Sequence, residues 1–251
     1  MKKAFQKVKP WLIFAVLLLI WYAVTATGLV KSYILPSVWS VFYAFVEMIK
    51  SGELFSSLLV SILRVLFGWL LAFVFALLFS IIRVFSKGAW EYLRYFDKFI
   101  RSIAPLSLFP FLILLFGIGE GAKLVVIALT AFFPMFVNFS SSFENADKDL
   151  VDLGRSLGFS KMRMFFKIYL PLSYYSMLTG IQTSLSYAYR SLVGVEIISS
   201  YKGLGYIIED SLLLHNLSRM FVGIITLALV GMIFDGLFSF ILKKCFKNYV
   251  R

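Results

Sequence analysis

The sequence predicts an all-α integral membrane protein with about six transmembrane helices, because apolar residues dominate the chain. They make up 61% of its 251 residues and charged residues only 15%, with a mean hydropathy of +0.89, whereas soluble domains are about 45–50% apolar and about 25% charged. The apolar residues form continuous runs of spanning length, roughly 20 residues, and not the alternating pattern of membrane β-barrel strands. The composition therefore excludes a soluble globular domain.

The first expected span, residues 11–30, follows a lysine-rich start, as the apolar part of a signal peptide would. It is too long for a signal peptide and lacks a clear small-x-small cleavage site, so we expect a retained helix. The apolar stretch that ends at Ile49 is too short to cross the membrane and predicts an interfacial helix. The second span, residues 54–85, is long enough to tilt or to extend beyond the bilayer.

The third expected span, residues 103–118, contains Pro105 and Pro110, which remove helical hydrogen bonds and predict a kinked helix. A short glycine-rich turn on the outer side leads into the fourth span, and the fifth opens at Pro171. No linker, internal repeat or second domain is evident, so one transmembrane domain over residues 1–251 is expected. The expected spans are residues 11–30, 54–85, 103–118, 122–142, 172–198 and 221–242.

The formal net charge of +12 is distributed as in a membrane protein and not as on a nucleic-acid-binding surface, so we expect no nucleic-acid partner. Most cations fall in four short segments, and the positive-inside rule then places both termini in the cytoplasm. With one cysteine and one histidine in the chain, no metal site of the ordinary His/Cys type is expected. The four segments contain Lys2, Lys3, Lys7, Lys9; Arg83, Lys87, Arg94, Lys98, Arg101; Lys148, Arg155, Lys161, Arg163, Lys167; and Lys243, Lys244, Lys247, Arg251.

The most polar part of the chain is the cytoplasmic loop over residues 144–170. Leu150, Leu153 and Leu157 recur at helical spacing and predict one apolar face of a short amphipathic helix. Gly158 is a natural helix stop, and Ser160 can cap a second short helix. The loop therefore predicts a helix-turn-helix that is apolar enough to dock on another protein.

The spacing within this loop resembles the Glu-Ala-Ala loop of bacterial ABC importer permeases. Asp152-Leu153-Gly154 is followed after three residues by Gly158, and after nine more by Ile168-Tyr169-Leu170-Pro171. The spacing matches throughout, although Asp replaces Glu and Leu-Gly replaces Ala-Ala. Five segments together are similar to permeases of the nitrate/sulfonate/taurine type: residues 61–68, 110–120, 132–138, 153–158 and 203–208.

This resemblance implies a permease fold like that of type I ABC importers, in the bacterial inner membrane. It implies two ATP-binding cassette subunits, a second permease copy, most simply as a homodimer, and an extracytoplasmic substrate-binding protein, with lipid around the spans. The solute would be small, anionic and sulfonate- or nitrate-like, or a vitamin precursor, moved inward by alternating access. The resemblance makes residues 150–163 coupling helices, with the docking residues Asp152, Leu153, Gly154, Leu157, Gly158, Phe159 and Ser160.

The chain contains no G-x-x-x-x-G-K-[ST] phosphate-binding loop. We therefore expect ATP hydrolysis on a separate subunit, and neither an enzymatic activity nor a cofactor in this chain. A membrane-embedded enzyme would need a constellation of catalytic or metal-binding side chains that a single histidine hardly supports. An ATP-independent channel or secondary transporter is the other alternative, and it would have no need of the spaced helix pair.

Charged residues within the expected spans are costly and must face water or a partner. Arg190 is a candidate for the translocation pathway, where it would attract an anion; alternatively it pairs with Glu196 or Asp235, or snorkels to an interface. Glu196 and Asn138 are further pathway candidates, although Asn138 and the nearby Pro134 also fit simple kinking of the fourth span. Arg64 fits a role in helix packing better than one in the pathway.

Overall fold

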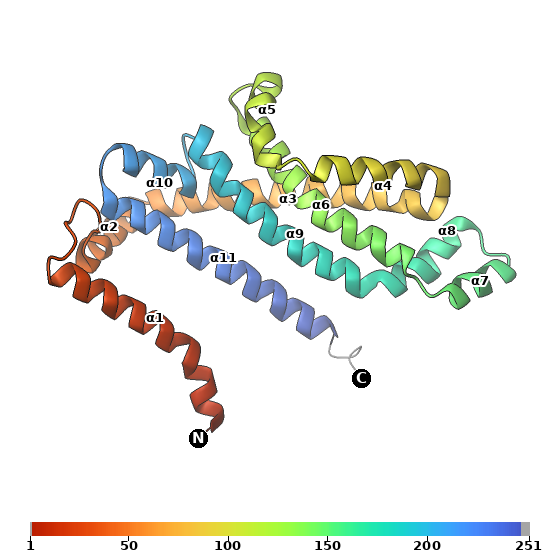
Figure 1. The fold of residues 1–251 in the computed structure, drawn as a ribbon, viewed down its shortest axis with the longest axis horizontal. Helices are drawn as coiled ribbons and strands as arrows, with labels where there is room; N and C mark the ends of the chain where they lie inside the picture. The colour runs from red at the N-terminus through yellow and green to blue at the C-terminus, as the bar shows by residue number, and fades with distance from the viewer. Residues whose placement is uncertain (1, 247–251) are drawn as a thin grey trace.

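A computed structural model describes residues 2–246, and these residues form helices and connecting turns without a β-strand. Lys247 and Arg251, of the last cation cluster, lie outside the described residues. Figure 1 shows α7 and α8 at one end of the elongated bundle and α2 and α10 at the other; we call these the α7 end and the α10 end. The helices are α1 (Lys2–Ala26), α2 (Val38–Lys50), α3 (Glu53–Phe85), α4 (Lys87–Arg101), η1 (Pro105–Leu108), α5 (Phe109–Phe116), α6 (Glu120–Glu144), α7 (Lys148–Ser156), α8 (Lys161–Met164), η2 (Phe165–Tyr169), α9 (Leu170–Ser199), α10 (Leu204–Leu213) and α11 (Leu217–Phe246).

Three of the described helices, α3, α6 and α11, are long and apolar enough to cross a membrane, and a bent pair made of α4 and η1–α5 would give a fourth span. The first expected span falls in α1, whose described apolar part, Leu12–Ala26, is shorter than these. The fifth falls in α9, whose mean hydropathy is lowered by serine, threonine, tyrosine and charged side chains. The helical membrane fold is thus confirmed, and the number of six spans stays a prediction.

The third expected span differs most from the structure. Residues 87–101, which lie between the second and third expected spans, form the amphipathic helix α4, and α5 leaves its direction by 80°. The break has a local cause: the residue before a proline avoids the helical region, and Ala104, before Pro105, is extended with ψ 121°. The eight residues of α5 rise only about 12 Å and cannot cross a bilayer alone.

The core of the bundle is built around α6, which packs against α3 on one side and α9 on the other. Glycines allow both contacts to be close. A β-carbon at Gly68 on α3 would lie 2.6 Å from Ile127 Cγ2, and one at Gly180 on α9 would lie 2.7 Å from Asn138 Cβ. As a result, α3, α6 and α9 form one closely packed unit that carries the segment between α6 and α9.

Candidate functional site

The loop between α6 and α9 folds into the predicted pair of short helices. Asp147 caps α7 by accepting a hydrogen bond from the Asp149 backbone N–H, and Ser160 caps α8 by accepting one from Arg163. Gly158 has φ +70° and ends α7, while the next N–H, that of Phe159, donates to the Gly154 carbonyl at 3.0 Å. The predicted helix stop and second cap are both confirmed.

The helix α7 has two apolar faces with different surroundings. Val151 and Gly154 are buried against the bundle. The predicted face remains exposed, with Leu150 at 42%, Leu153 at 55% and Leu157 at 61% relative exposure. Exposed leucines clustered on one helix face are typical of a surface that another protein covers. We call Leu150, Leu153 and Leu157 the α7 face.

At position 154 this chain has glycine where the Glu-Ala-Ala pattern has alanine, and the packing around Gly154 explains the difference. A β-carbon there would lie 2.4 Å from Ile168 Cδ1 and 2.6 Å from Met164 Sδ, so α7 approaches η2 more closely than alanine allows. Behind this contact Phe165 packs on Phe143 of α6, with ring centroids 5.7 Å apart. The α7 face is therefore attached to the bundle through packed side chains.

A second attachment runs from α8 to α3. The Nζ of Lys161 donates a hydrogen bond of 2.9 Å to the carbonyl of Phe85, the last residue of α3. By contrast, the ion pair between Arg155 and Asp152 on α7 is exposed on both sides and contributes little to stability. Displacement of α7 and α8 would thus be transmitted to α3, α6 and α9 together.

The charged residue Arg64 lies at the centre of a buried polar network nearer the α10 end. Its Nη1 donates to Glu196 Oε1 at 2.7 Å and to the carbonyl of Lys202 at 2.6 Å, while Nε and Nη2 donate to the two carboxylate oxygens of Glu120, each at 2.6 Å. Lys123 pairs with Glu120 as well, at 3.0 Å. The network joins three helices, because Arg64 comes from α3, Glu120 and Lys123 come from α6, and Glu196 comes from α9.

Glu196 is fully buried and is held by more than Arg64. The Ser61 hydroxyl donates to its carboxylate at 2.8 Å, and the backbone N–H of Gly205 donates to Oε2 at 2.8 Å. A β-carbon at Gly203, where φ is +134°, would lie 2.4 Å from Glu196 Oε1. The two glycines before and within α10 are therefore needed to admit the carboxylate, which places Glu196 in a closed network.

Arg190 lies elsewhere, on the exposed side of α9. Among the described residues it has no ion pair with Glu196 or Asp235; its guanidinium lies 6.0 Å from the centre of the Tyr187 ring. Arg190 and Asp235 line one pocket of about 180 Å³ between α9 and α11, and Asp235 accepts a hydrogen bond of 2.6 Å from Ser186. In the described part of the chain, Arg190 is therefore not neutralised by either of the carboxylates expected as its alternative partners.

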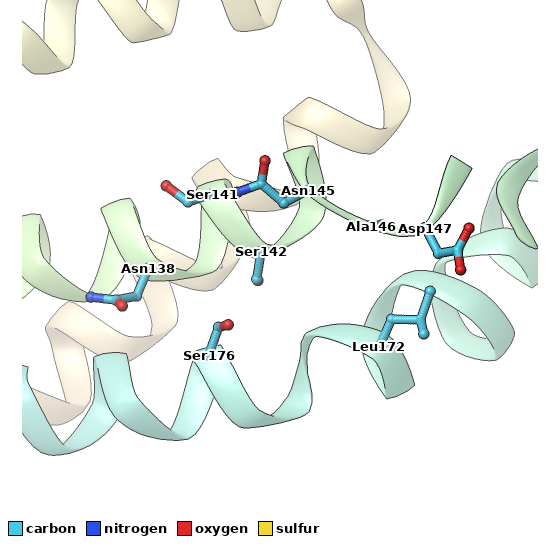
Figure 2. Close-up of a pocket in the computed structure, with 8 residues that line it drawn as sticks. All are labelled: Asn138, Ser141, Ser142, Asn145, Ala146, Asp147, Leu172 and Ser176. Atoms are coloured by element: carbon cyan, nitrogen blue, oxygen red, sulfur yellow. The ribbon is translucent and has the colours of Figure 1, made fainter. Parts of the chain in front are cut away.

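Asn138 lines a different pocket, of about 350 Å³, between α6 and α9 at the α7 end. Figure 2 shows Asn138, Ser141 and Ser142 on α6, Asn145 directly after its last residue, and Ser176 on α9 around this space. The Asn138 side-chain amide donates to the Pro134 carbonyl at 2.7 Å. The three pathway candidates thus occupy three separate places: Arg190 and Asn138 line two different pockets, and Glu196 lies in the closed network.

The sequence alone did not predict the partners of Arg64 or the role of Gly203 and Gly205. Arg64 and Glu196 are 132 positions apart, and no periodicity links them. A usable signal was present nonetheless, because an arginine and a glutamate inside apolar spans are expected to find each other. Among the residues that the structure describes, no group of three or more metal-ligating side chains comes together.

Comparison with known proteins gives a consistent result. The model of a family described as "binding-protein-dependent transport system inner membrane component" matches residues 7–247. An aliphatic sulfonates transport permease protein, SsuC, of Bacillus subtilis is 34% identical over 98% of this chain and 89% of its own length. SsuC of Escherichia coli is 31% identical over 93% of this chain and 89% of its own length.

More distant similarity extends to a nitrate import permease protein, NrtB, of Leptolyngbya laminosa, which is 26% identical over 76% of this chain and 68% of its own length. Among solved structures, a chain of the MetNI methionine ABC transporter in inward-facing conformations superposes with a TM-score of 0.62 at 16% sequence identity. The superposition covers 77% of this chain and 94% of that one. This last similarity shows the fold alone.

Proposed function

Because this chain belongs to the family of binding-protein-dependent transport system inner membrane components, we propose that it moves a small anion inward, driven by ATP hydrolysis on separate subunits. The observation that carries the proposal is the α7 face, which is apolar, exposed and firmly attached to the bundle. A solvent-exposed surface of this kind is stabilised when a partner covers it. An ATP-independent channel or secondary transporter would have no use for it.

The proposed partner on the α7 face is an ATP-binding cassette subunit, one for each permease copy. Its approach to a second such subunit on binding ATP would push α7 and α8, and the contacts of Gly154 and Lys161 would pass that displacement to α3, α6 and α9. The docking residues proposed from the sequence keep this role: Asp152, Leu153, Gly154, Leu157, Gly158, Phe159 and Ser160. In the proposed orientation the α7 end faces the cytoplasm of a bacterial cell and both termini lie on the cytoplasmic side of the membrane, as the distribution of cations favours.

The proposed pathway lies where two copies of this chain meet. Thr179, Tyr187 and Arg190 leave a polar, exposed stripe on α9, at a helical repeat and within a segment that lies among membrane-spanning helices. Polar and charged side chains in the bilayer are placed toward a protein partner or water and away from lipid. A second copy of the chain, with a water-filled passage between the two copies, would keep these polar side chains away from lipid. A substrate-binding protein would deliver the solute at the α10 end.

The proposed solute class is a small anion such as an aliphatic sulfonate or nitrate. Relatives named for sulfonate and nitrate transport cover most of the chain, and Arg190 offers an exposed guanidinium without a paired carboxylate among the described residues. Guanidinium groups bind oxyanions by paired hydrogen bonds. Neither Arg64, which is paired with Glu196 in the closed network, nor Lys123, which pairs with Glu120, offers a comparable free cation.

The function is tested by reconstituting this chain in proteoliposomes with its ATP-binding subunit and its substrate-binding protein. Uptake of a radiolabelled aliphatic sulfonate, with nitrate as a second solute, is measured with ATP and without it. We expect uptake to require both ATP and the ATP-binding subunit. Uptake at the same rate without ATP would support the channel or secondary transporter instead.

Substituting Arg190→Gln in the same assay should lower uptake by about tenfold or more while leaving basal ATPase activity intact, because one charge-assisted contact to the anion is lost. Lys31→Gln, which removes an exposed cation outside the helices, is the matched control and should transport normally. Wild-type uptake by Arg190→Gln would remove Arg190 from the pathway.

A further inference from the structure

Asp235 carries a negative charge within α11, and none of the described residues forms an ion pair with it. It follows Leu217, the first residue of α11, by about five helical turns, roughly 27 Å, and lies in the part of this helix that is apolar enough to cross a membrane. The residue is exposed, and the hydrogen bond from the Ser186 hydroxyl engages only Oδ1 of its carboxylate. A charged group in such a segment is costly unless it faces water or a ligand of opposite charge. Asp235 therefore has the properties of a ligand-binding group.

The opposite charge of Arg190 lies close to Asp235 without neutralising it. Both residues line the pocket of about 180 Å³ between α9 and α11. Ser186, which donates to Asp235, precedes Arg190 by about one helical turn, roughly 6 Å along α9. One pocket is thus lined by a guanidinium and a carboxylate about one turn apart, and each lacks an ionic partner among the described residues.

Two aromatic rings complete the Asp235 side of this pocket. Tyr189 and Phe234 both line it, with ring centroids 5.8 Å apart, and the Tyr189 hydroxyl donates to the Leu227 carbonyl, which fixes that ring in place. Aromatic rings attract ammonium groups, and a carboxylate next to them adds a charged acceptor. The Asp235 side therefore favours a cationic group, whereas the Arg190 side favours an anionic one.

From this arrangement we propose that the pocket binds the solute as a zwitterion, with its anionic group on Arg190 and an ammonium group on Asp235. Asp235 is then a residue that determines specificity. The inference rests on the proposed function and narrows its solute class to anions that carry an amino group. A chain of three carbons separates an ammonium nitrogen from a sulfonate sulfur by about 5 Å, which is close to the helical turn between Ser186 and Arg190.

The charges favour such a solute over a simple anion. A nitrate ion or an alkyl sulfonate on Arg190 would bring its charge near the Asp235 carboxylate without neutralising it. An ammonium group has three N–H donors, and Oδ2 of Asp235, which accepts no hydrogen bond from the described residues, is available to them. A zwitterion therefore neutralises both charged groups of the pocket at once.

The test compares two solutes of nearly the same shape, 3-aminopropanesulfonate and butanesulfonate, in which an ammonium group replaces a methyl group. Proteoliposomes contain the complete transporter with its substrate-binding protein, and the ratio of the two ATP-dependent uptake rates is measured. The selectivity of the substrate-binding protein is the same for every permease variant, so a change in this ratio reports the permease. We expect Asp235→Asn to lower uptake of the amino solute by about tenfold, the effect of one charge-assisted hydrogen bond, and to leave butanesulfonate uptake within about twofold.

A second variant and a control separate this effect from a general loss of structure. Phe234→Leu keeps the site apolar but removes one ring, so it should lower uptake of the amino solute alone, by about threefold. Glu47→Gln, which removes an exposed carboxylate on α2 outside the pocket, is the matched control and should leave the ratio unchanged.

An unchanged ratio in Asp235→Asn would overturn the proposal, and the proposed function would stand if butanesulfonate uptake still required ATP. Equal losses of both solutes in a monodisperse Asp235→Asn complex would overturn it as well. If that complex is not monodisperse, Phe234→Leu decides, and an unchanged ratio there has the same meaning. Unmodified transporter that takes up neither solute with ATP would contradict the proposed function itself, and the zwitterion site with it.

Discussion

Substituting Arg64→Met is expected to destabilise the protein by about 3–5 kcal/mol, the cost of leaving a buried charge without its partner. Glu196, which is fully buried, would lose the only cation that contacts it among the described residues. Glu120 would be affected less, since it is partly exposed and keeps Lys123. Methionine preserves most of the volume of arginine, so the effect reports the charge and its hydrogen bonds more than a cavity.

The measurement is the thermal midpoint of the purified protein in detergent, followed by the loss of monodisperse material in size-exclusion chromatography. At about 2–4 °C per kcal/mol for a chain of this length, a decrease on the order of 10 °C is expected. The double variant Arg64→Met with Glu196→Gln should recover much of that loss, since no charge is then left alone. The matched control is Arg155→Met, whose ion pair with Asp152 is exposed and should change the midpoint little. Equal midpoints for the two arginine variants would show that the buried network is not a source of stability.

Placing two aspartates on the α7 face, Leu153→Asp with Leu157→Asp, should separate the permease from its ATP-binding subunit. Both side chains are more than half exposed, so the fold of the chain itself should survive. Buried apolar contacts at the centre of an interface contribute about 2 kcal/mol each or more. The loss of two corresponds to an affinity roughly a thousandfold lower.

The measurement is the amount of ATP-binding subunit that co-purifies with the tagged permease. The matched control is Leu212→Asp with Leu213→Asp, two similarly exposed leucines at the α10 end, which should leave co-purification unchanged. ATP-binding subunit recovered at the wild-type level with the α7 variant would place the docking surface elsewhere.

The helix pair α7–α8 could be predicted from the sequence because its signals are local. The leucines at helical spacing, Gly158 as a stop and Ser160 as a cap each act within a few residues of their own position. The replacement of alanine by Gly154 could be noticed but not explained from the sequence, since its cause is the approach of Met164 and Ile168 across the turn.

The polar network and the bend after α4 depend on information that a local pattern does not carry. Arg64 meets Glu196 only because α3 and α9 both pack near the start of α6. Likewise, Pro105 predicted a kink, but the bend angle of 80° depends on where η1 and α5 pack after the break. The sequence placed Arg190, Glu196 and Asn138 together as pathway candidates, and the structure distributes them over two pockets and one closed network.

The proposed function depends most directly on the contact between the α7 face and an ATP-binding subunit, and site-specific photo-cross-linking tests that contact. A photoreactive amino acid at position 153, and for comparison at the membrane-facing position 78, is activated in cells that contain the assembled transporter. Position 153 should yield an adduct with the mass of this chain plus the ATP-binding subunit, and position 78 should not. An assembled complex that gives no such adduct from position 153 would contradict the proposed contact between the α7 face and the ATP-binding subunit.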